Sequence, residues 1–436
     1  MGFQRHAAAG SCDISGYPKP ARPGLVLRDA RAYTENRRST GRFYAPGREE
    51  RGMNGRELPE GEGKMAKKLG FGFMRLPLLK EEDPASIDYP ALETLVDAFL
   101  ARGFTYFDTA PTYHAGHSEE ALRRVLVERY PRGAFTLASK MPPWRLEGPE
   151  HPARLFAGQL ERCGVEYFDY YLAHSINREH YAQAKEYGVF EFIAQKKREG
   201  KILRAGLSFH DTPEFLDQVL TEHPELDFVQ LQINYLDWNS PAVQARRCYE
   251  IARAHAKPIF VMEPCKGGRL AKLPTEAQAL LNTRAPGTPA AGWAFRFAAG
   301  LEGVEMVLSG MNTLEQVLEN TAVLKAPVPL EKEEQALLEQ AARLLRQSEL
   351  VACTGCGYCA EGCPAGIPIP QVLELYNQAL PAGAPTAGQA AAYAALPGAK
   401  AAQCVGCKKC ETVCPQRLPV AARMRQTAAL FGQTGA

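Results

Sequence analysis

Between Leu69 and Gly310 the chain alternates short apolar runs with longer amphipathic segments. The eight apolar runs are LGFGFM (69–74), FTYFDTA (104–110), FTLASK (135–140), YFDYYLAH (167–174), ILRAGLSF (202–209), FVQLQINY (228–235), PIFVMEP (258–264) and EMVLSG (305–310). Several are rich in Phe, Tyr, Val and Ile, which is typical of buried strands. The segments between them, such as YPALETLVDAFLARG (89–103), have the apolar spacing of helices. Eight strands that alternate with helices over about 260 residues predict a (β/α)8 TIM barrel of the α/β class, with an open doubly wound sheet as the alternative.

Two stretches outside this pattern differ in composition. Residues 1–64 have a basic excess, many Gly and Pro, and no sustained apolar period. We therefore expect a disordered or spurious N-terminal extension, with Met53 or Met65 as the true first residue. The barrel should then span residues 65–330. The charged amphipathic segment at its end predicts a helical linker, so residues 331–436 are expected to form this linker and a small, mostly helical domain.

Composition and charge exclude several classes of protein. Apolar residues make up 45% and charged residues 23% of the 436 residues, with a net charge of +2, as in globular proteins. No apolar run approaches the ~18–20 residues that a membrane span needs, and the first residues hold no apolar segment typical of a secretory signal. The basic residues form no block, so we expect neither a nucleic-acid nor a membrane partner. The expected location is the reducing cytoplasm, where clustered cysteines favour metal over disulfides.

Eight of the 12 cysteines lie from Cys353 onward, in two copies of one spacing. The first copy, CTGCGYCAEGCP, contains Cys353, Cys356, Cys359 and Cys363, and the second, CVGCKKCETVCP, contains Cys404, Cys407, Cys410 and Cys414. Both read C-x2-C-x2-C-x3-C-P, the spacing of paired [4Fe–4S] clusters. The short gaps let a tight turn direct three thiolates to three corners of one cluster, whereas the fourth cysteine lies beyond the reach of that loop.

The fourth cysteine of each copy usually ligates the other cluster. Cluster I is therefore expected to use Cys353, Cys356, Cys359 and Cys414, and cluster II to use Cys404, Cys407, Cys410 and Cys363. A pair of zinc sites is the alternative, but zinc needs only two CxxC pairs and has no use for the third cysteine. The region resembles dicluster bacterial ferredoxins, and the long separation of the copies (364–403) resembles helical dicluster modules of larger redox enzymes. Tyr358 and Tyr376 are expected to pack.

Four polar residues fall at the predicted carboxyl ends of three successive strands, where a (β/α)8 barrel carries its active site. Asp108 ends the second run, Tyr113 follows in the next loop, Lys140 ends the third run and His174 ends the fourth. Each residue taken alone has a purely structural interpretation: Asp108 as a helix cap, Tyr113 as a packing residue, Lys140 as a surface charge and His174 as a core histidine. Together, the lysine would lower the pKa of the phenol, the aspartate would orient the lysine, and the histidine would hydrogen-bond a substrate oxygen. The group predicts a proton donor to a carbonyl oxygen as hydride arrives.

The segment DTAPTYHAGHSEEAL (108–122) resembles the D-T-A-x-x-Y…G-x-S-E signature of the aldo/keto reductase family. ASK (138–140) and LAH (172–174) resemble the lysine and histidine strands of that family, and the resemblance extends from about Leu69 to Leu324. It implies that Asp108, Tyr113, Lys140 and His174 form a catalytic tetrad in which Tyr113 is the general acid. With its cysteine region, the whole chain resembles the iron–sulfur branch of the family.

The same resemblance implies a bound NAD(P)H. Its contacts would be Ser208 and Gln230 at the nicotinamide carboxamide, and Ser309, Gly310, Gln316, Glu319 and Asn320 at the pyrophosphate and adenosine, near a helix N-terminus. Three positions depart from the family. Its Ser-Asn pair reads Ser-Phe (208–209), Glu263 stands where an aromatic ring usually stacks on the nicotinamide, and residues 311–312 offer no cation for a 2′-phosphate. Lys266 and Arg269 are the nearby alternatives for that cation.

The two halves of the chain leave three functions open. In the first, which the intact tetrad favours, the protein reduces a small-molecule carbonyl or oxidises an alcohol with NAD(P)H, and its clusters are structural or redox-sensing. In the second, it is an iron–sulfur electron-transfer protein whose barrel docks a redox partner such as a ferredoxin, or reduces a substrate without nicotinamide. In the third, the barrel is non-catalytic. A flavin normally links two-electron nicotinamide to one-electron clusters, and no sequence feature clearly supplies one.

Overall fold

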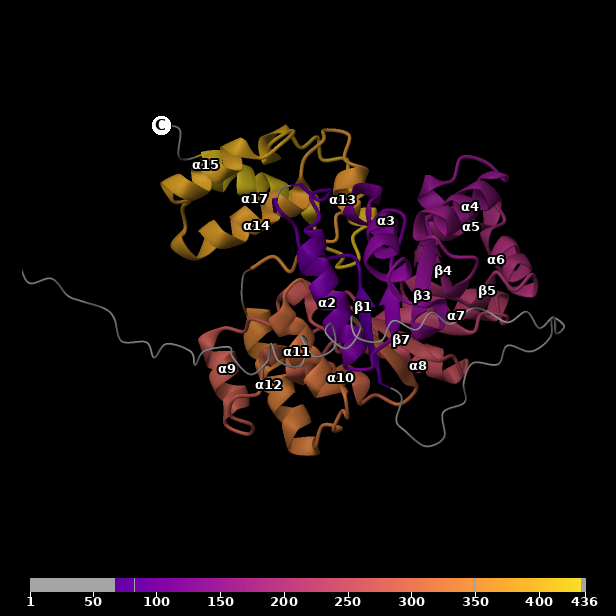
Figure 1. Ribbon diagram of the computed structural model, residues 1–436. Helices are drawn as coiled ribbons and strands as arrows, with labels where there is room; N and C mark the ends of the chain where they lie inside the picture. Colours follow the sequence, from indigo (N-terminus) through magenta and orange to yellow (C-terminus); the bar gives the residue numbers. More distant parts are fainter. Residues whose placement is uncertain (1–66, 82, 348–349, 433–436) are drawn as a thin grey trace, which may run out of the picture. The chain divides into compact units, whose positions relative to one another are not determined.

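The computed structural model describes residues 67–81, 83–347 and 350–432 (Figure 1). The prediction for residues 1–64 lies outside this part of the chain. The barrel and the C-terminal helices belong to one compact unit. Within the described ranges, no helix combines the length and the apolar character that crossing a membrane requires.

Eight parallel strands close into a barrel in the order of the sequence, with the last strand next to the first. The strands are β1 (Leu69–Gly72), β2 (Tyr106–Asp108), β3 (Thr136–Met141), β4 (Phe168–Ile176), β5 (Ile202–Phe209), β6 (Phe228–Gln232), β7 (Ile259–Met262) and β8 (Val304–Ser309). Each strand overlaps one of the eight apolar runs. The prediction of a (β/α)8 barrel is therefore confirmed, and the alternative of an open sheet is wrong.

Helices cover the outside of the barrel (Figure 1). They are α2 (Tyr89–Ala101), α3 (Ser118–Leu122), α4 (His151–Cys163), α5 (Arg178–Glu186), α6 (Val189–Arg198), α7 (Pro213–Glu222), α8 (Ala245–Ala254), α9 (Thr275–Asn282), α10 (Ala290–Ala299), α11 (Leu314–Leu324) and α12 (Lys332–Gln347). Short turns are η1 (Tyr113–Gly116), η2 (Arg123–Val127), η3 (Arg132–Ala134), η4 (Pro143–Arg145) and η5 (Lys266–Gly268). Side-chain caps fix several helix starts; the Thr212 hydroxyl, for example, accepts from the backbone N–H of Phe215.

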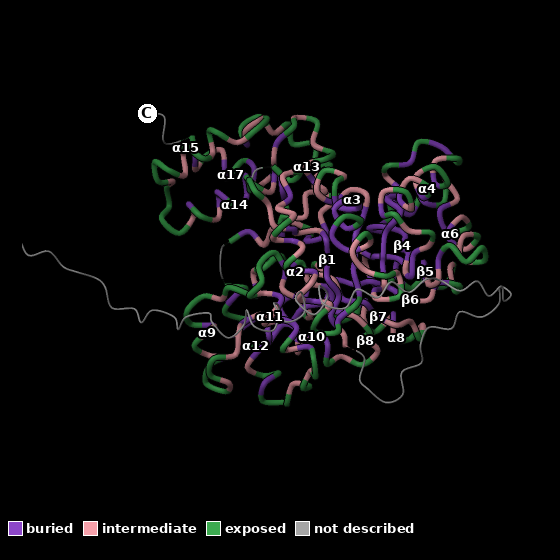
Figure 2. The backbone as a smooth tube through the Cα atoms, in the orientation of Figure 1, coloured by how far each residue is buried: buried purple, intermediate pink, exposed green. Residues whose placement is uncertain are grey.

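Large side chains from six strands fill the interior of the barrel. Tyr106, Ala138, Leu172, Phe228, Phe260 and Leu308 form one buried cluster, and the strands are almost wholly buried in Figure 2. Gly206 of β5 lies against this cluster, because a Cβ added there would come within 2.6 Å of the Phe228 ring. The interior is thus a packed core, and chemistry is left to the rim of the barrel.

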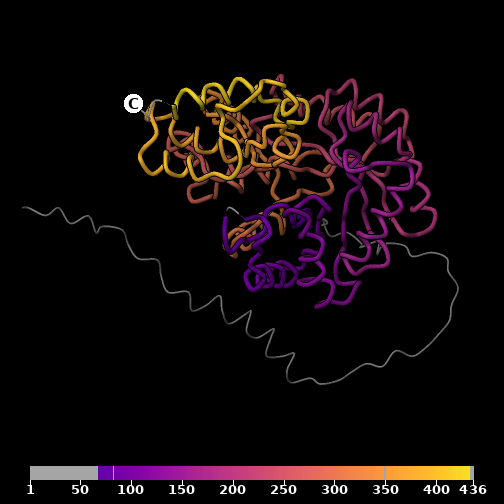
Figure 3. The backbone as a smooth tube through the Cα atoms, turned by 90° about the horizontal axis from the view of Figure 1, so that it is seen from above, coloured from indigo at the N-terminus to yellow at the C-terminus, as the bar shows by residue number. Residues whose placement is uncertain are grey.

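The C-terminal part is a small helical domain, as predicted. Its helices are α13 (Tyr358–Glu361), α14 (Ile369–Ala379), α15 (Ala387–Ala395), α16 (Lys409–Thr412) and α17 (Val420–Gly432), with short turns η6 (Leu380–Ala382) and η7 (Ala401–Gln403). These yellow helices lie together in Figures 1 and 3. They share an apolar core that includes Ile367, Val372, Leu373, Val420 and Met424.

The helix that the sequence analysis expected as a linker packs as part of the barrel. Leu338 and Leu345 of α12 share a buried cluster with Trp293 of α10. Glu334 of α12 also pairs with Arg296 of α10 at 2.7 Å. The apolar face of α12 is therefore buried against the outer helices of the barrel, and the cysteine region begins beyond it.

Candidate active site at the barrel mouth

The four polar residues expected at the strand ends meet at one place. Lys140 Nζ donates to Asp108 Oδ1 at 2.6 Å and to the backbone oxygen of Thr109 at 2.9 Å. The same Nζ lies 4.8 Å from the ring centre of Tyr113, whose ring packs edge-on against His174. This arrangement follows from the fold, because the carboxyl ends of neighbouring parallel strands share one rim of the barrel.

The Asp108–Lys140 pair is buried, with exposed fractions of 3% and 1%. Burial raises the pKa of Asp108 and lowers the pKa of Lys140, because each charged form loses its water. The attraction between the two groups opposes both shifts. The pair therefore holds the lysine ammonium group at a fixed position beside Tyr113.

Tyr113 has a pKa well above its ordinary value, because burial and the Asp108 carboxylate disfavour the phenolate. Arg75 and a hydrogen bond with Tyr358 oppose this shift. The expectation of a lowered pKa is therefore wrong for the net shift, since the loss of water around the phenol outweighs the opposing effects of Arg75 and the Tyr358 hydrogen bond. Tyr113 consequently keeps its proton at neutral pH, which suits a proton donor.

His174 is a neutral imidazole near pH 7. Burial, and then the charge of Lys140, hold its pKa well below the ordinary value. Its Nε2 lies 3.1 Å from the hydroxyl of Tyr358, whereas its buried Nδ1 has no hydrogen-bond partner among the described residues. Trp144 packs against both rings, with centroids 5.1 Å from His174 and 5.8 Å from Tyr358, and so fixes their positions.

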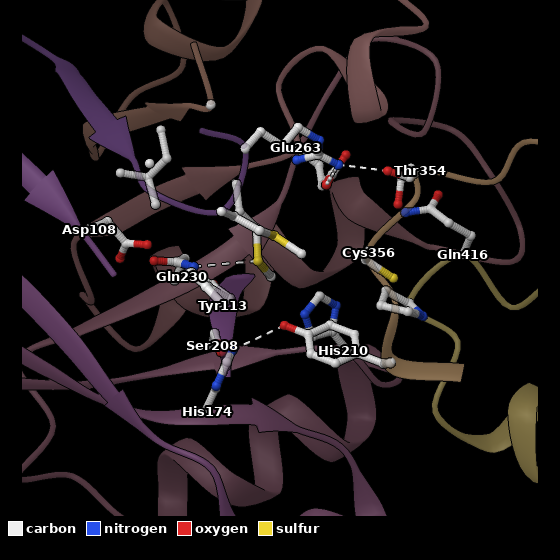
Figure 4. Close-up of a pocket in the computed structure, with 18 residues that line it drawn as sticks. Asp108, Tyr113, His174, Ser208, His210, Gln230, Glu263, Thr354, Cys356 and Gln416 are labelled. Atoms are coloured by element: carbon white, nitrogen blue, oxygen red, sulfur yellow. Dashed lines mark hydrogen bonds and ion pairs between the residues drawn. The ribbon is translucent and has the colours of Figure 1, made fainter. Parts of the chain in front are cut away.

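Asp108, Tyr113, His174 and Tyr358 line a cavity of about 80 Å³ that residues of both domains enclose. Cys356 and Gln416 of the C-terminal domain face Tyr113 and His174 across it (Figure 4). A wider groove of about 860 Å³ borders Tyr113, Cys356 and Tyr358 as well. The inner cavity and the larger groove therefore share lining residues that come from the barrel and from the C-terminal domain.

Polar contacts tie the first cysteine loop to the barrel. Arg75 Nη2 donates to the backbone oxygen of Thr354 at 2.6 Å and lies 3.4 Å from Glu263 Oε1. At the rim of the groove, Arg145 Nη2 lies 3.1 Å from Glu361 Oε2, where both side chains are partly exposed. The C-terminal domain is thus anchored over the residues expected to perform catalysis.

The cysteines fall into the two sets expected from their spacing. One cavity is lined by Cys353, Cys356, Cys359 and Cys414, and another by Cys363, Cys404, Cys407 and Cys410. In the described part of the chain, no three metal-binding side chains converge closely enough to hold a single ion. The four thiols of each set line a cavity instead of converging on one position, which is the arrangement that a cubane cluster requires. Each set, with one cysteine from the other copy, therefore fits a [4Fe–4S] cluster.

The sequence analysis did not single out Arg75, His210 or Gln416 of the cavity lining, or Trp144 beside it. Tyr358 was expected only to pack. It precedes the third cysteine of the first copy, where the second copy has Lys409. This difference between two otherwise matching loops was the signal that one loop faces an apolar, partly buried partner and the other faces solvent.

The residues implied for a dinucleotide are only partly brought together. Ser208, Gln230 and Gly310 line the cavity at the barrel mouth. The other four lie outside the lining of this cavity: Ser309, Gln316, Glu319 and Asn320. Within this second set, Asn320 Nδ2 donates to Ser309 Oγ at 3.3 Å.

Comparison with known proteins agrees with this architecture. The model of the aldo/keto reductase family matches residues 68–343, and the model of the 4Fe-4S dicluster domain matches residues 352–418. None of the curated proteins compared matches the chain.

Solved structures share the fold of the barrel. The holo form of the aldo-keto reductase AKR11C1 from Bacillus halodurans is 22% identical, with a TM-score of 0.51, over 63% of this chain and 91% of that one. Two structures from Klebsiella pneumoniae, one with NADP and acetate and one with NADPH, are 23% and 24% identical, with TM-scores of 0.51 and 0.50, over 65% of this chain and 92% of theirs. Since the family match spans more than half of the sequence, the chain belongs to the aldo/keto reductase family and carries a C-terminal 4Fe-4S dicluster domain.

Proposed function

We propose that the protein is an oxidoreductase that reduces the carbonyl group of a small molecule, or oxidises the corresponding alcohol, in the cavity at the barrel mouth. We also infer that its C-terminal domain binds two [4Fe–4S] clusters. One observation carries the proposal: a single cavity is lined by Tyr113 and His174 of the barrel and by Cys356 of the dicluster domain. A proton donor and the first cysteine loop would therefore border the same molecule when it binds in this cavity.

Tyr113 would act as the proton donor. When negative charge develops on a carbonyl oxygen in the cavity, the phenol donates its proton to that oxygen. The neutral imidazole of His174 orients the same oxygen by a second hydrogen bond. The Lys140 ammonium group, fixed by Asp108, lies 4.8 Å from the phenol ring and stabilises the phenolate that remains.

The two sets of cysteines would each hold one cluster. Cluster I would use Cys353, Cys356, Cys359 and Cys414, and cluster II would use Cys404, Cys407, Cys410 and Cys363. When bound, such clusters store and transfer single electrons. Cys359 of the first set is buried and Cys407 of the second is exposed. Cluster II would accordingly lie closer to solvent, where a small electron-carrier protein such as a ferredoxin is the partner we propose.

Nicotinamide is the second candidate for the source of electrons. The Klebsiella pneumoniae relatives were solved with NADP or NADPH, and Ser208 and Gln230 line the cavity here as a carboxamide site would require. The contact of Cys356 with the same cavity favours instead a donor that acts through the dicluster domain. Both sources lead to the same chemistry at Tyr113, because either one leaves negative charge on the substrate oxygen.

The test begins with protein purified without oxygen. Iron, sulfide and the EPR spectrum of the reduced protein would report the clusters. A panel of aliphatic, aromatic and conjugated carbonyls is then supplied with NADH, NADPH or reduced methyl viologen. We expect carbonyl-dependent oxidation of at least one donor, slowed by about 10²–10⁴-fold in Tyr113→Phe.

The matched control is Tyr249→Phe, because the hydroxyl of Tyr249 donates to the backbone oxygen of Glu302 and does not line the cavity. This control should retain full turnover. If every carbonyl is inert with every donor, or if Tyr113→Phe is as active as the parent, the proposed function is wrong.

A further inference from the structure

We propose that the docked C-terminal domain takes the place of a nicotinamide dinucleotide at the barrel mouth, so that neither NADH nor NADPH binds there. The proposal rests on the proposed function only for the class of reaction in the cavity. It is argued from the close approach of the two domains at the barrel mouth and from the protein contacts that most of the expected cofactor residues make.

At the nicotinamide end, the side chains have other partners. Ser208 Oγ accepts the backbone N–H of Ser175 at 2.7 Å. Glu263 stands where the family has a stacking ring, and its carboxylate lies 3.4 Å from the guanidinium of Arg75. Because a carboxylate paired with an arginine offers no flat apolar face, this position does not support a nicotinamide ring by stacking.

The turn after β7 is in direct contact with the first cysteine loop. A Cβ added to Gly267 would lie 2.6 Å from the Cα of Thr354 and 2.8 Å from its backbone oxygen. Gly267 has a φ of 64°, so the turn itself favours glycine. Backbone thus lies against backbone here, and no space remains between the two segments for the phosphates of a dinucleotide.

The cations near this turn are engaged as well. Lys266 is 4% exposed, and its Nζ donates to both carboxylate oxygens of Asp237, at 2.6 and 2.7 Å, and to Gln416 Oε1 at 2.6 Å. Arg269 donates to the backbone oxygen of Leu345 at 3.3 Å. The two side chains that the sequence offered for a 2′-phosphate therefore stabilise the barrel mouth and the docked domain instead.

The adenosine end is satisfied within its own segment. Gln316 Oε1 accepts the backbone N–H of Asn312 at 2.9 Å, and Asn320 donates to Ser309 at 3.3 Å. Five of the side chains expected to contact a dinucleotide are thus paired with protein groups, namely Ser208, Lys266, Arg269, Gln316 and Asn320, whereas the buried Oε1 of Gln230 has no partner among the described residues. Arg75 and Lys266 also pair with residues of the C-terminal domain.

The absence of a dinucleotide would narrow the class of substrate. Reduction of a carbonyl to an alcohol takes two electrons and two protons, of which Tyr113 supplies one proton and solvent the other. Without a hydride donor, the electrons must come one at a time from a low-potential one-electron donor, such as reduced methyl viologen in the assay. The species formed after the first electron is a radical, so the carbonyls to expect are conjugated ones that delocalise an unpaired electron.

The experiment measures binding rather than turnover. Full-length protein carrying its clusters, kept anaerobic, is titrated with NADPH and with NADH, followed by nicotinamide fluorescence and by calorimetry. The Klebsiella pneumoniae reductase solved with NADPH serves as the positive control. We expect no saturable binding up to about 1 mM, the upper end of ordinary enzyme affinities. Hydrogen–deuterium exchange of residues 263–270 and 308–320 should be the same with and without NADPH.

Saturable binding that slows exchange in either of these two segments would overturn the proposal. Saturable binding that leaves both segments unchanged would place the nucleotide elsewhere and would support a closed mouth. Since none of these readouts requires a substrate, the result is independent of whether a carbonyl is reduced. A protein that reduces no carbonyl and binds no dinucleotide would therefore refute the proposed function and not this inference.

Discussion

The hydroxyl of Tyr358, from the first cysteine loop, lies 3.1 Å from Nε2 of His174, at the carboxyl end of β4. The same hydroxyl is hydrogen-bonded to Tyr113. A substrate carbonyl held by Tyr113 and His174 would need these two partners, so it would compete with the Tyr358 hydroxyl for them. The loop that carries Cys356 and Cys359 is thereby joined directly to the catalytic side chains.

Replacing Tyr358 by phenylalanine should loosen this loop from the barrel. The change removes the hydrogen bonds of this hydroxyl to His174 and Tyr113, each worth about 0.5–1.5 kcal/mol. We expect faster hydrogen–deuterium exchange in residues 353–358. The matched control is Tyr393→Phe, whose hydroxyl accepts the N–H of Ala401 inside the C-terminal domain. If both variants change exchange at 353–358 equally, the contact with His174 does not hold the loop.

Two neighbouring glycines offer a sharper test of docking. Gly267 and Gly268 both have left-handed φ values, of 64° and 95°, so alanine at either position costs roughly 1–2 kcal/mol in the backbone. Only at Gly267 would the new carbon meet Thr354; at Gly268 nothing lies within 4 Å. We expect Gly267→Ala to lower stability by a further ~1–3 kcal/mol, measured by thermal unfolding. Equal losses in the two variants would contradict the close contact.

The strands and the tetrad could be predicted because local pattern determines them. The run EMVLSG (305–310) corresponds to β8 (Val304–Ser309), and the run at 167–174 corresponds to β4, because strands buried on both faces read as continuous apolar segments. Lys140 and His174 meet Asp108 because parallel strands bring their ends to one rim. None of these inferences needs contacts between distant domains.

The partners of Tyr358 and Lys266 could not be predicted in this way. The bonds of Tyr358 to His174 and of Lys266 to Gln416 form only because the C-terminal domain docks on the barrel, which depends on the complementarity of two folded surfaces. The pKa of Tyr113 also could not be predicted from the sequence. Lys140 is recognisable there as an adjacent charge, but the burial that dominates the shift is a property of the folded protein.

Behind the tetrad, Glu119 of α3 is the centre of a buried polar network. It is 0% exposed and accepts from Ser139 Oγ at 2.8 Å, Gln159 Nε2 at 2.9 Å and Arg162 Nε at 2.8 Å. Burial raises the pKa of Glu119, while Arg162 and the hydrogen bonds oppose that shift. The network fixes β3 next to Lys140, because Gln159 also donates to the backbone oxygen of Lys140 at 3.0 Å.

Glu119→Ala should therefore be strongly destabilising. It removes the acceptor of the buried donors Ser139 and Gln159 and of the partly exposed Arg162, and breaking a buried ion pair costs about 3–5 kcal/mol. Arg162 keeps 31% side-chain exposure and can turn toward water, so we expect the lower end of that range. Glu120→Ala, at the neighbouring exposed position, should change stability by less than about 0.5 kcal/mol. Chemical denaturation of the two variants compares them; similar losses would show that the network carries little stability.

The most direct test of the cysteine sets uses pairs of substitutions. Cys414 follows the second motif in sequence, yet it lines the cavity of Cys353, Cys356 and Cys359. If Cys353 and Cys414 hold the same cluster, the double variant Cys353→Ser/Cys414→Ser should lose no more iron than either single variant, about half of the total. Cys404→Ser/Cys414→Ser should lose nearly all of it, because it removes a ligand from each cluster.

Iron content and the EPR spectrum of the reduced protein distinguish the two pairings. Cys163→Ser is the control for the substitution itself, since Cys163 is buried in α4 and belongs to neither cavity. The opposite result, with Cys404→Ser/Cys414→Ser keeping half of the iron, would mean that each motif holds its own cluster. When the fourth cysteine of each motif ligates the other cluster, each cluster bridges the loops at 353–359 and 404–414. Without that exchange, the clusters would not hold the two motifs together.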